Sequence, residues 1–147
     1  MGIFQSLNIS ASALTAQRLR MDVISSNMAN METTRAEYVD GQWQPYRRKM
    51  VVTAEDTKPF SAFLNQELNG VGNGVRVQAI VEDETPFKIV YDPDHPDANE
   101  NGYVSLPNVD PLKEMVDLIS STRSYEANVT SFNASKNMLL KALEIGK

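Results

Sequence analysis

The side chains that could carry out chemistry are few in this chain, and they limit the functions it could have. The 147 residues include no cysteine and a single histidine, His95. Without cysteine the chain has no disulfides, thiolate metal ligands, iron–sulfur clusters or thiol nucleophiles. A histidine-based metal cluster would need carboxylates or a second subunit to complete it. A serine triad would have only His95 as its base, and no nucleophile elbow is present.

The acidic side chains gather in one segment, which is the first candidate for a cation site. Residues 82–104 contain seven acids and one base, in a chain whose formal net charge is −5. Residues 92–97 read Asp-Pro-Asp-His-Pro-Asp and resemble part of a calcium loop. An EF-hand loop beginning at Asp92 requires glycine at its sixth position and glutamate at its twelfth, where this sequence has Asp97 and Tyr103. We therefore expect a rigid charged surface loop with an exposed His95, and no metal site.

The other segments of the chain do not indicate cofactor binding or catalysis either. The glycine-rich residues 70–74 precede an expected strand, whereas a dinucleotide-binding loop follows a strand and begins a helix. A hairpin turn is therefore the preferred interpretation of that run. No pair of acidic residues lies in apolar surroundings that would raise a pKa. We expect a protein that is not an enzyme and binds no cofactor.

The only basic cluster contains Arg47, Arg48 and Lys49. Nucleic-acid binding requires more positive charge than this, so no nucleic-acid partner is expected. We predict instead that the cluster makes polar contacts between subunits, with residues 82–84 of another copy as one candidate partner. No run approaches the roughly 18–20 apolar residues of a membrane span. The N-terminus also lacks the basic start and continuous apolar stretch of a secretory signal.

Two long amphipathic helices are predicted, one at each end of the chain. Residues 3–28 carry one apolar line with a seven-residue repeat, formed by Leu7, Leu14, Met21 and Met28 with Ile24 beside it. A second apolar line on the same helix is formed by Ala16, Leu19 and Val23. Residues 110–145 begin with an Asp-Pro helix start. Their apolar face is formed by Leu112, Met115, Val116, Ile119, Val129, Phe132, Leu139 and Leu143.

The middle of the chain has a different pattern, with strands expected at 49–54, 75–82 and 87–91. A short helix at 60–68 and a loop at 91–107 complete it. We predict an α+β fold in which long N- and C-terminal helices pack as a coiled-coil-like pair, with a small β-containing middle region. Residues 1–30 and 107–147 would form one helical domain, and residues 31–106 the middle region.

Helices of this length should have surfaces that a single chain does not cover. They would be about 39 and 54 Å long, whereas a compact domain of this size has a radius of gyration near 15 Å. An exposed apolar seam of that length is a binding surface. We expect the first apolar line to pack against the C-terminal helix. The second line, with Ala16 and Val23, is expected to pack against an adjacent subunit.

Several spaced motifs resemble those of bacterial flagellar rod, hook and hook-associated axial proteins. Residues 26–34 are similar to the N-terminal signature, a helix ending in an Asn-x-Ala-Asn-x-x-Thr pattern, formed here by Asn27, Ala29, Asn30 and Thr33. Arg35 departs from the glycine often found after it in hook and distal-rod members. Residues 46–49, 91–98, 102–104, 107–110 and 114–117 resemble the proximal-rod member. So does the segment 123–128, through Arg123, Tyr125, Glu126 and Asn128.

The resemblance implies a structural subunit of the flagellar proximal rod, which polymerises through its terminal helices to build the drive shaft and export channel. It implies partners among other copies, other rod proteins, basal-body ring and adaptor proteins, and the flagellar type III export apparatus. The location would be the rod crossing the periplasm, reached without a cleaved signal peptide. Asn27 and Asn30 are expected to hydrogen-bond the free carbonyls where the first helix ends.

The residues themselves leave other functions open. The chain could be another helical-assembly protein, such as a phage-tail or secretion-needle component. It could also be a cytoplasmic adaptor that uses its helices as a coiled coil. A hydrolase acting on cell-wall glycan is the third alternative.

Overall fold

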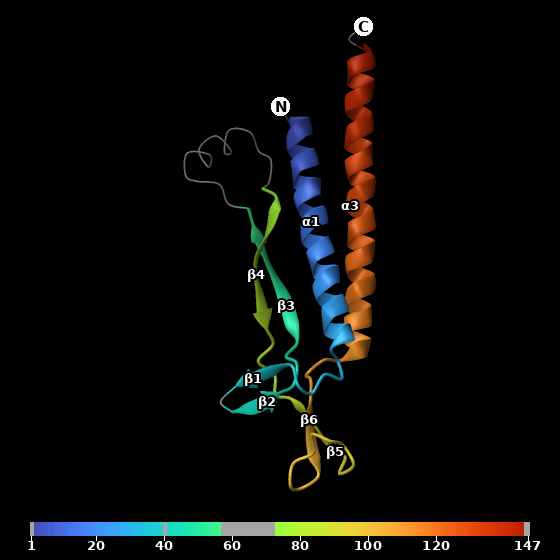
Figure 1. The fold of residues 1–147 in the computed structure, drawn as a ribbon. Coiled ribbons are helices and arrows are strands. Elements are labelled where there is room, and N and C mark those ends of the chain that lie inside the picture. The colour runs from blue at the N-terminus through green and yellow to red at the C-terminus, as the bar shows by residue number, and fades with distance from the viewer. Residues whose placement is uncertain (1, 40, 57–72, 146–147) are drawn as a thin grey trace. The chain divides into compact units, whose positions relative to one another are not determined.

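A computed structural model describes residues 2–39, 41–56 and 73–145 of the chain. The elements in order are α1 (Gly2–Ala29), β1 (Glu37–Val39), β2 (Gln42–Gln44), β3 (Lys49–Glu55), β4 (Val75–Glu82), β5 (Lys88–Tyr91), β6 (Tyr103–Leu106) and α3 (Pro111–Ile145) (Figure 1). This confirms the α+β fold, with a helix at each end and short strands between. The helix predicted at 60–68 lies outside the described residues.

The end of α1 and the start of α3 are each explained by the chemistry of the residues at the boundary. After Ala29, the side-chain amide of Asn30 donates to the carbonyl of Ser26 at 2.9 Å, which satisfies a free carbonyl at the helix end. The carboxylate of Asp110 accepts a hydrogen bond from the backbone N–H of Leu112 at 3.0 Å. Pro111 occupies the first helical position, where its missing N–H costs nothing. The predicted boundaries of both helices are therefore confirmed to within one residue.

Among the described residues the strands pair as three two-stranded sheets, β1–β2, β3–β4 and β5–β6. The first and last are antiparallel, and each places two aromatic rings opposite one another. Tyr38 faces Trp43, and Tyr91 faces Tyr103, each pair edge to face with ring centroids 5.2 Å apart. Such cross-strand pairs stabilise short hairpins. The sequence predicted β3, β4 and β5, but it did not predict β1, β2 or β6.

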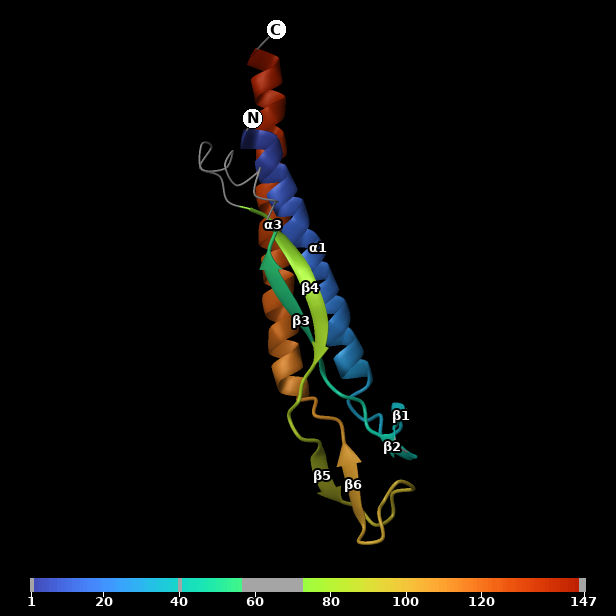
Figure 2. The same ribbon diagram turned by 90° about the vertical axis from the view of Figure 1, so that its left-hand side faces the viewer.

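The chain divides into two compact units, and the division crosses both helices. One unit contains Met1–Arg20, Val51–Ala79 and Ser120–Lys147, and the other contains Met21–Met50 and Ile80–Ile119. Within each unit a segment of α1 lies beside a segment of α3 (Figures 1 and 2). These units differ from the division expected from the sequence. A separately folding helical domain of residues 1–30 and 107–147 stays a prediction.

The helical interior of the first unit is built from small side chains. Ser10 and Ala16 of α1 are buried, and so are Ser121 and Ser135 of α3. Small side chains at a contact allow two helices to approach closely. Ser121 and Ser135 are fourteen residues apart, which is two seven-residue repeats of a coiled coil, and Asn128 between them is half-buried.

The start of β4 is held against α1 by a single serine. The hydroxyl of Ser12 donates to the carbonyl of Ile9 at 2.8 Å and accepts from the N–H of Val75 at 3.1 Å. A Cβ at Gly74 would lie 2.6 Å from that hydroxyl oxygen. Glycine is therefore needed here for the strand to approach the helix.

The second apolar line of α1 is covered within the chain more than expected. Ala16, Val23 and Ile24 are the buried apolar residues among residues 4–29 of this helix, so Ala16 and Val23 are covered within the chain and not by an adjacent subunit. Leu19 is half-buried, as are the members of the first line, Leu7, Leu14, Met21 and Met28. The expectation was wrong because a periodic pattern marks a face without specifying what covers it.

The apolar face expected on α3 is also only partly covered. Val129, Phe132 and Leu139 are half-buried. Leu112, Met115, Ile119 and Leu143 are exposed, so the predicted packing of these four residues against α1 is wrong in this chain. Their packing against other subunits stays a prediction. The reason is that the seven-residue register facing inward is carried by Glu114, Ser121 and Ser135.

Candidate functional site

A cluster of polar and charged side chains is buried in the second unit, where α1 ends and α3 begins. Asn27 is 1% exposed, Arg48 is 8% exposed and Glu114 is fully buried. We call this group the junction cluster; its members are Asn27, Tyr46, Arg48, Asp83, Asn108, Glu114 and Asp117. They come from α1, from α3, from the segment before β3 and from the segments after β4 and β6, so the cluster joins parts of the chain that are distant in sequence.

Asn27 uses its complete hydrogen-bonding capacity inside this cluster. Its amide nitrogen donates to the backbone carbonyl of Lys49 at 2.9 Å and to the carboxylate of Glu114 at 3.0 Å. Its amide oxygen accepts from the hydroxyl of Tyr46 at 3.0 Å and from the N–H of Lys49 at 2.9 Å. An asparagine side chain offers two donors and two acceptor positions, and all four are used. Asn27 therefore bonds α3 and β3 and not the helix-end carbonyls expected from the sequence, where only Asn30 is found.

Arg48 is the single cation of the cluster and contacts three carboxylates. Its Nε donates to Glu114 at 2.6 Å, and its terminal nitrogens lie 3.3 Å from Asp83 and 3.5 Å from Asp117. The backbone N–H of Arg48 donates to the side-chain oxygen of Asn108 at 2.7 Å. The amide of Asn108 in turn donates to the carbonyl of Asp83 at 3.0 Å. One guanidinium thus ties β3 to both the start of α3 and the segment after β4.

Charge and burial act in opposite directions on these groups. Burial alone would lower the pKa of Arg48, but the hydrogen bonds and negative charges of Glu114 and Asp83 raise it above its ordinary value. The pKa of Asp83 is lowered, chiefly by hydrogen bonds from the backbone and hydroxyl of Thr85 and further by Arg48. Both shifts favour the charged forms, so Arg48 and Asp83 are ionised at neutral pH.

The position of Arg48 corrects the expectation that residues 47–49 form one surface for contacts between subunits. Arg48 is buried and its acidic partners belong to the same chain, so it does not face another copy. Its neighbours are less buried: Arg47 is half-buried and Lys49 is exposed. For Arg47 and Lys49, contact with another subunit stays a prediction.

A buried ion pair contributes less to stability than to the uniqueness of the packing. The cost of removing charges from water nearly cancels their attraction, yet loss of one partner is expensive because the other stays buried and unpaired. Misaligning α1 against α3 by one residue would break the bond between Asn27 and Glu114. The junction cluster therefore fixes how α1, β3 and α3 are aligned in this unit.

Outward-facing residues of α3 have the opposite chemistry. Leu112, Met115, Val116 and Ile119 are between 50% and 74% exposed. Their spacing puts them on one face of the helix, because residues three and four apart are neighbours. In the other unit, Met138, Leu140 and Leu143 are exposed as well. Apolar side chains exposed together on one helix face are typical of protein-binding surfaces.

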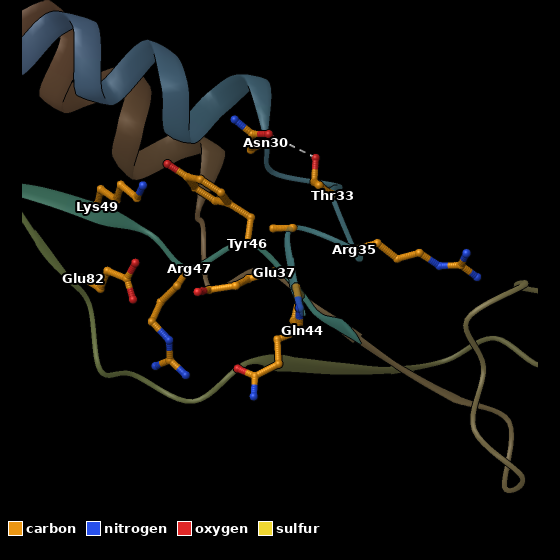
Figure 3. Close-up of a pocket in the computed structure, with 11 residues that line it drawn as sticks. Asn30, Thr33, Arg35, Glu37, Gln44, Tyr46, Arg47, Lys49 and Glu82 are labelled. Carbon is orange, nitrogen blue, oxygen red and sulfur yellow. Dashed lines mark hydrogen bonds between the residues drawn. The ribbon is translucent and has the colours of Figure 1, made fainter. Parts of the chain in front are cut away.

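An open polar pocket of about 620 Å³ lies in the second unit (Figure 3). It is lined by the segment after α1, by β1 and β2, and by the ends of β3 and β4. Its charged lining residues are Arg35, Arg47, Lys49, Glu37 and Glu82. Figure 3 shows Arg47, Lys49 and Glu82 at one end of the pocket, and Arg35 directed away from them at the other.

The acidic loop that follows β5 is tied to the end of α1. The carboxylate of Asp97 accepts from the hydroxyl of Thr34 at 2.6 Å and forms an ion pair with Arg35. These two contacts, that from Thr34 first, lower the pKa of Asp97. His95 is half-buried, which corrects the expectation of an exposed group, because its Nδ1 accepts the N–H of Asp97 at 3.1 Å. Over 2–39, 41–56 and 73–145, no acidic or histidine cluster is arranged to hold a metal.

Comparison with known proteins decides the family of this chain. Residues 7–36 match the family described as flagella basal body rod protein, and residues 100–145 match the flagellar basal body rod FlgEFG protein C-terminal family. The chain is 65% identical to the flagellar basal-body rod protein FlgC of Bacillus subtilis over 150 residues, with all of both chains covered. The chain belongs to the FlgC family of flagellar basal-body rod proteins.

More distant FlgC proteins match over the same extent. That of Borreliella burgdorferi is 48% identical over 153 residues, covering 99% of this chain and 98% of that protein. That of Salmonella typhimurium is 41% identical over 147 residues, with both chains covered completely. This FlgC-family chain is a structural subunit of the basal-body rod of the bacterial flagellum, as the resemblance in its motifs implied.

The family motif of the rod proteins has a structural explanation in this FlgC-family chain. Asn30 closes α1, and the carbonyl of Thr33 accepts the N–H of Tyr46 at 3.0 Å, which fixes the chain after the helix. In α3, the amide of Asn128 donates to the carbonyl of Ser124 at 2.8 Å, and Tyr125 is half-buried. The remaining motif members Ala29, Arg123 and Glu126 are exposed.

Sequence reasoning missed Glu114, Asp83 and Asn108 as members of the junction cluster. A signal for Glu114 was present, because it begins a polar line with a seven-residue repeat: Glu114, Ser121, Asn128 and Ser135. That line marks the buried side of α3 as clearly as an apolar line would. Within the described residues, no helix is both long and apolar enough to span a membrane.

Proposed function

We propose that this rod subunit polymerises through its terminal helices and so forms part of the drive shaft and the export channel of the flagellum. The observation that carries the proposal is the reversed polarity of α3. Its buried positions include Glu114, Ser121 and Ser135, while Leu112, Val116 and Ile119 are exposed. A helix arranged in this way leaves its apolar side chains for other molecules to cover.

The four exposed residues alone could supply the free energy of association. Covering a leucine or isoleucine side chain contributes roughly 1.5–3 kcal/mol, so the four residues Leu112, Met115, Val116 and Ile119 would contribute several kcal/mol for each subunit contact. Association must overcome the entropy lost by both partners. A repeated contact of this size suits an assembly of many subunits. The half-buried Leu7, Leu14 and Leu139 are available to the same interfaces.

The junction cluster fixes the position of the exposed apolar face of α3, through which the subunit would assemble. Arg48 and Glu114 fix the start of α3 beside the end of α1, and the exposed face of α3 begins at Leu112, two residues before Glu114. Polymerisation requires every copy to present the same surface. We therefore assign the cluster a positioning role and no catalytic one, because its carboxylates are already bound by Arg48 and Asn27.

The partners we propose are other copies, other rod proteins, basal-body ring and adaptor proteins, and the flagellar type III export apparatus. The names of the matched relatives, all basal-body rod proteins, support this choice. The subunit would take its place in the rod where it crosses the periplasm, after export without a cleaved signal peptide. The subunit would catalyse no reaction on the way.

The test is a double substitution on the exposed face of α3. Leu112→Asp with Ile119→Asp should abolish swimming and remove the protein from purified basal bodies, because two charges would be buried at the subunit contact. Its far-ultraviolet circular dichroism should stay unchanged, since both residues are exposed in the single chain. Lys113→Asp with Ser120→Asp is the matched control on neighbouring exposed positions, and should swim. Normal swimming of the Leu112→Asp, Ile119→Asp variant would refute the proposal.

A further inference from the structure

Two cations of the polar pocket lie over aromatic rings, and the guanidinium of Arg47 also donates to the backbone carbonyl of Asp83 at 3.3 Å. The guanidinium of Arg47 lies 4.5 Å from the ring centre of Phe87, and the ammonium of Lys49 lies 5.8 Å from that of Tyr46. Within the described parts of the chain, neither side chain forms an ion pair. A cation over an aromatic ring is positioned but keeps its charge available to an anion.

The other charged residues of the pocket limit what could enter it. Arg35 is already paired with Asp97 of the acidic loop. Glu37 and Glu82 line the pocket as well, so its charge is mixed and only a small anionic group placed beside Arg47 and Lys49 would be favoured. The pocket is therefore suited to one or two carboxylates at the tip of a narrow loop, and not to a long polyanion.

The chain itself contains a loop of this kind. Asp92, Asp94 and Glu100 are exposed and have no cation partner among the described residues. The turn that presents them is fixed by hydrogen bonds, including those from the N–H of His95 to the carbonyl of Asp92 and from the N–H of Ala98 to the carbonyl of His95. A pre-formed loop loses little entropy when it binds.

We propose that the acidic loop of one copy, with Asp94 at its tip, docks in the Arg47–Lys49 pocket of a neighbouring copy. The inference rests on the proposed polymerisation of the subunit and names one contact within it. The occupant we assign is another copy, because Asp97 holds the loop of the same chain at Arg35, and Arg47 and Lys49 have no carboxylate partner among the described residues. The negative charge of the loop complements two cations that form no ion pair within the described residues.

The contact joins two different patches, which determines the kind of assembly it can build. A contact between unlike surfaces leaves one of each free on every pair, so copies add head to tail into a ring or a helical filament. A rod is built from such arrangements. Ion pairs at an exposed rim determine orientation more than affinity, so this contact would set the rotation between neighbours while the apolar face of α3 holds them together.

Disulfide cross-linking in basal bodies tests the contact directly, because the natural chain has no cysteine. Cells would make two versions of the full chain, one with Lys49→Cys and one with Asp94→Cys. After mild oxidation, basal bodies from these cells should contain a disulfide-linked dimer of twice the 16.4 kDa chain mass. Cells that make Lys49→Cys together with Glu126→Cys, an exposed acid on α3, should give none.

The outcomes separate this inference from the proposed function. If both cysteine variants enter basal bodies and no dimer forms, or if the Glu126→Cys control cross-links equally, the loop contact is refuted while polymerisation stands. If no version of the chain enters basal bodies at all, the proposed function fails first. The expected dimer, specific to the Lys49 and Asp94 positions, would support both.

Charge reversal gives a second measurement that does not depend on cysteine. Lys49→Glu and Asp94→Lys should each lower incorporation into basal bodies by roughly fivefold, the scale expected for losing an exposed ion pair. Combining Lys49→Glu with Asp94→Lys should restore it. Glu82→Gln should raise incorporation, because it removes a competing carboxylate from the pocket. Single reversals without effect, or a combination that fails to restore incorporation, would overturn the proposed contact.

Discussion

Glu114 and Met115 are consecutive residues of α3, and their surroundings are the reverse of what their chemistry suggests. The carboxylate is fully buried, while half of the methionine is exposed. The same reversal extends along the helix, with Ser121 and Ser135 buried and Leu112, Leu143 and their apolar neighbours exposed. In most single domains the apolar residues lie inside and supply the stability.

The two sides of α3 have different roles. The inner side, with Glu114 bonded to Arg48 and Asn27, makes the alignment of α1 and α3 unique but contributes little net stability. The outer side holds apolar surface whose burial would stabilise only an assembly. A protein that binds its neighbours in the folded state gains stability from them by mass action.

The largest expected effect is on the inner side, for Glu114→Ala. This substitution would leave Arg48 buried without its closest carboxylate and remove an acceptor from Asn27. We expect a loss of about 3–5 kcal/mol in the free energy of unfolding. Urea unfolding followed by circular dichroism measures it.

Asp117→Ala is the matched control, because Asp117 also contacts Arg48 from α3. Its side chain is half-exposed and lies 3.5 Å from the guanidinium. We expect a loss below about 1 kcal/mol. Equal losses of unfolding free energy for Glu114→Ala and Asp117→Ala would mean that the buried contact with Arg48 is no stronger than the exposed one. The distinction between the inner and the outer side of α3 would then fail.

Truncating a buried and an exposed apolar side chain should change the free energy of unfolding by different amounts. Ile24→Ala removes a buried side chain of α1 and should lower the free energy of unfolding by about 2 kcal/mol or more. Leu112→Ala removes an exposed side chain and should change it by less than about 0.5 kcal/mol. Calorimetry on the two purified variants compares them, and a Leu112→Ala loss as large as that of Ile24→Ala would show that α3 is covered within the chain.

A smaller effect is expected in the pH dependence of stability. The folded pKa of Asp83 lies below its unfolded value of about 3.9, so its contribution to stability is present at neutral pH and is lost as the pH falls through the folded value. Asp83→Asn lacks this contribution at every pH. The difference in urea midpoint between the natural chain and Asp83→Asn should therefore be constant from pH 7 to about 5 and shrink below about 4. A difference that grows in acid would contradict the network.

A small effect is also expected for His95→Ala. Its ring accepts one backbone hydrogen bond from Asp97, worth about 0.5–1.5 kcal/mol. Swimming should persist, because the ion pair between Asp97 and Arg35 remains. Complete loss of rod assembly in this variant would point to a role for His95 that the loop geometry does not explain.

The sequence was sufficient for the elements that are long and periodic. The bounds of α1 and α3 follow from their periodic apolar residues, from the lack of glycine or proline after the first residue of each helix, and from the Asp110-Pro111 start. The strands β3 and β4 follow from seven- and eight-residue runs of β-forming residues. In contrast, β1 and β2 have three residues each and β6 has four, too short for a pattern to stand out from a polar loop.

The junction cluster could not be predicted because its contacts join residues far apart in the chain. Arg48 lies 35 positions from Asp83 and 66 from Glu114, and a basic run in a sequence normally marks a solvated surface. The seven-residue repeat likewise located the faces of α1 without telling which face the chain covers. Local patterns define elements, whereas the choice between an inner and an outer face depends on packing.

The central claim is that the outer face of α3 is covered by neighbouring subunits in the rod. Ile119→Cys introduces a single thiol at an exposed position of that face, in a chain without other cysteines. The account predicts rapid reaction of this thiol with a maleimide reagent in the free subunit and strong protection in purified basal bodies. Equal reaction in the two states would contradict it.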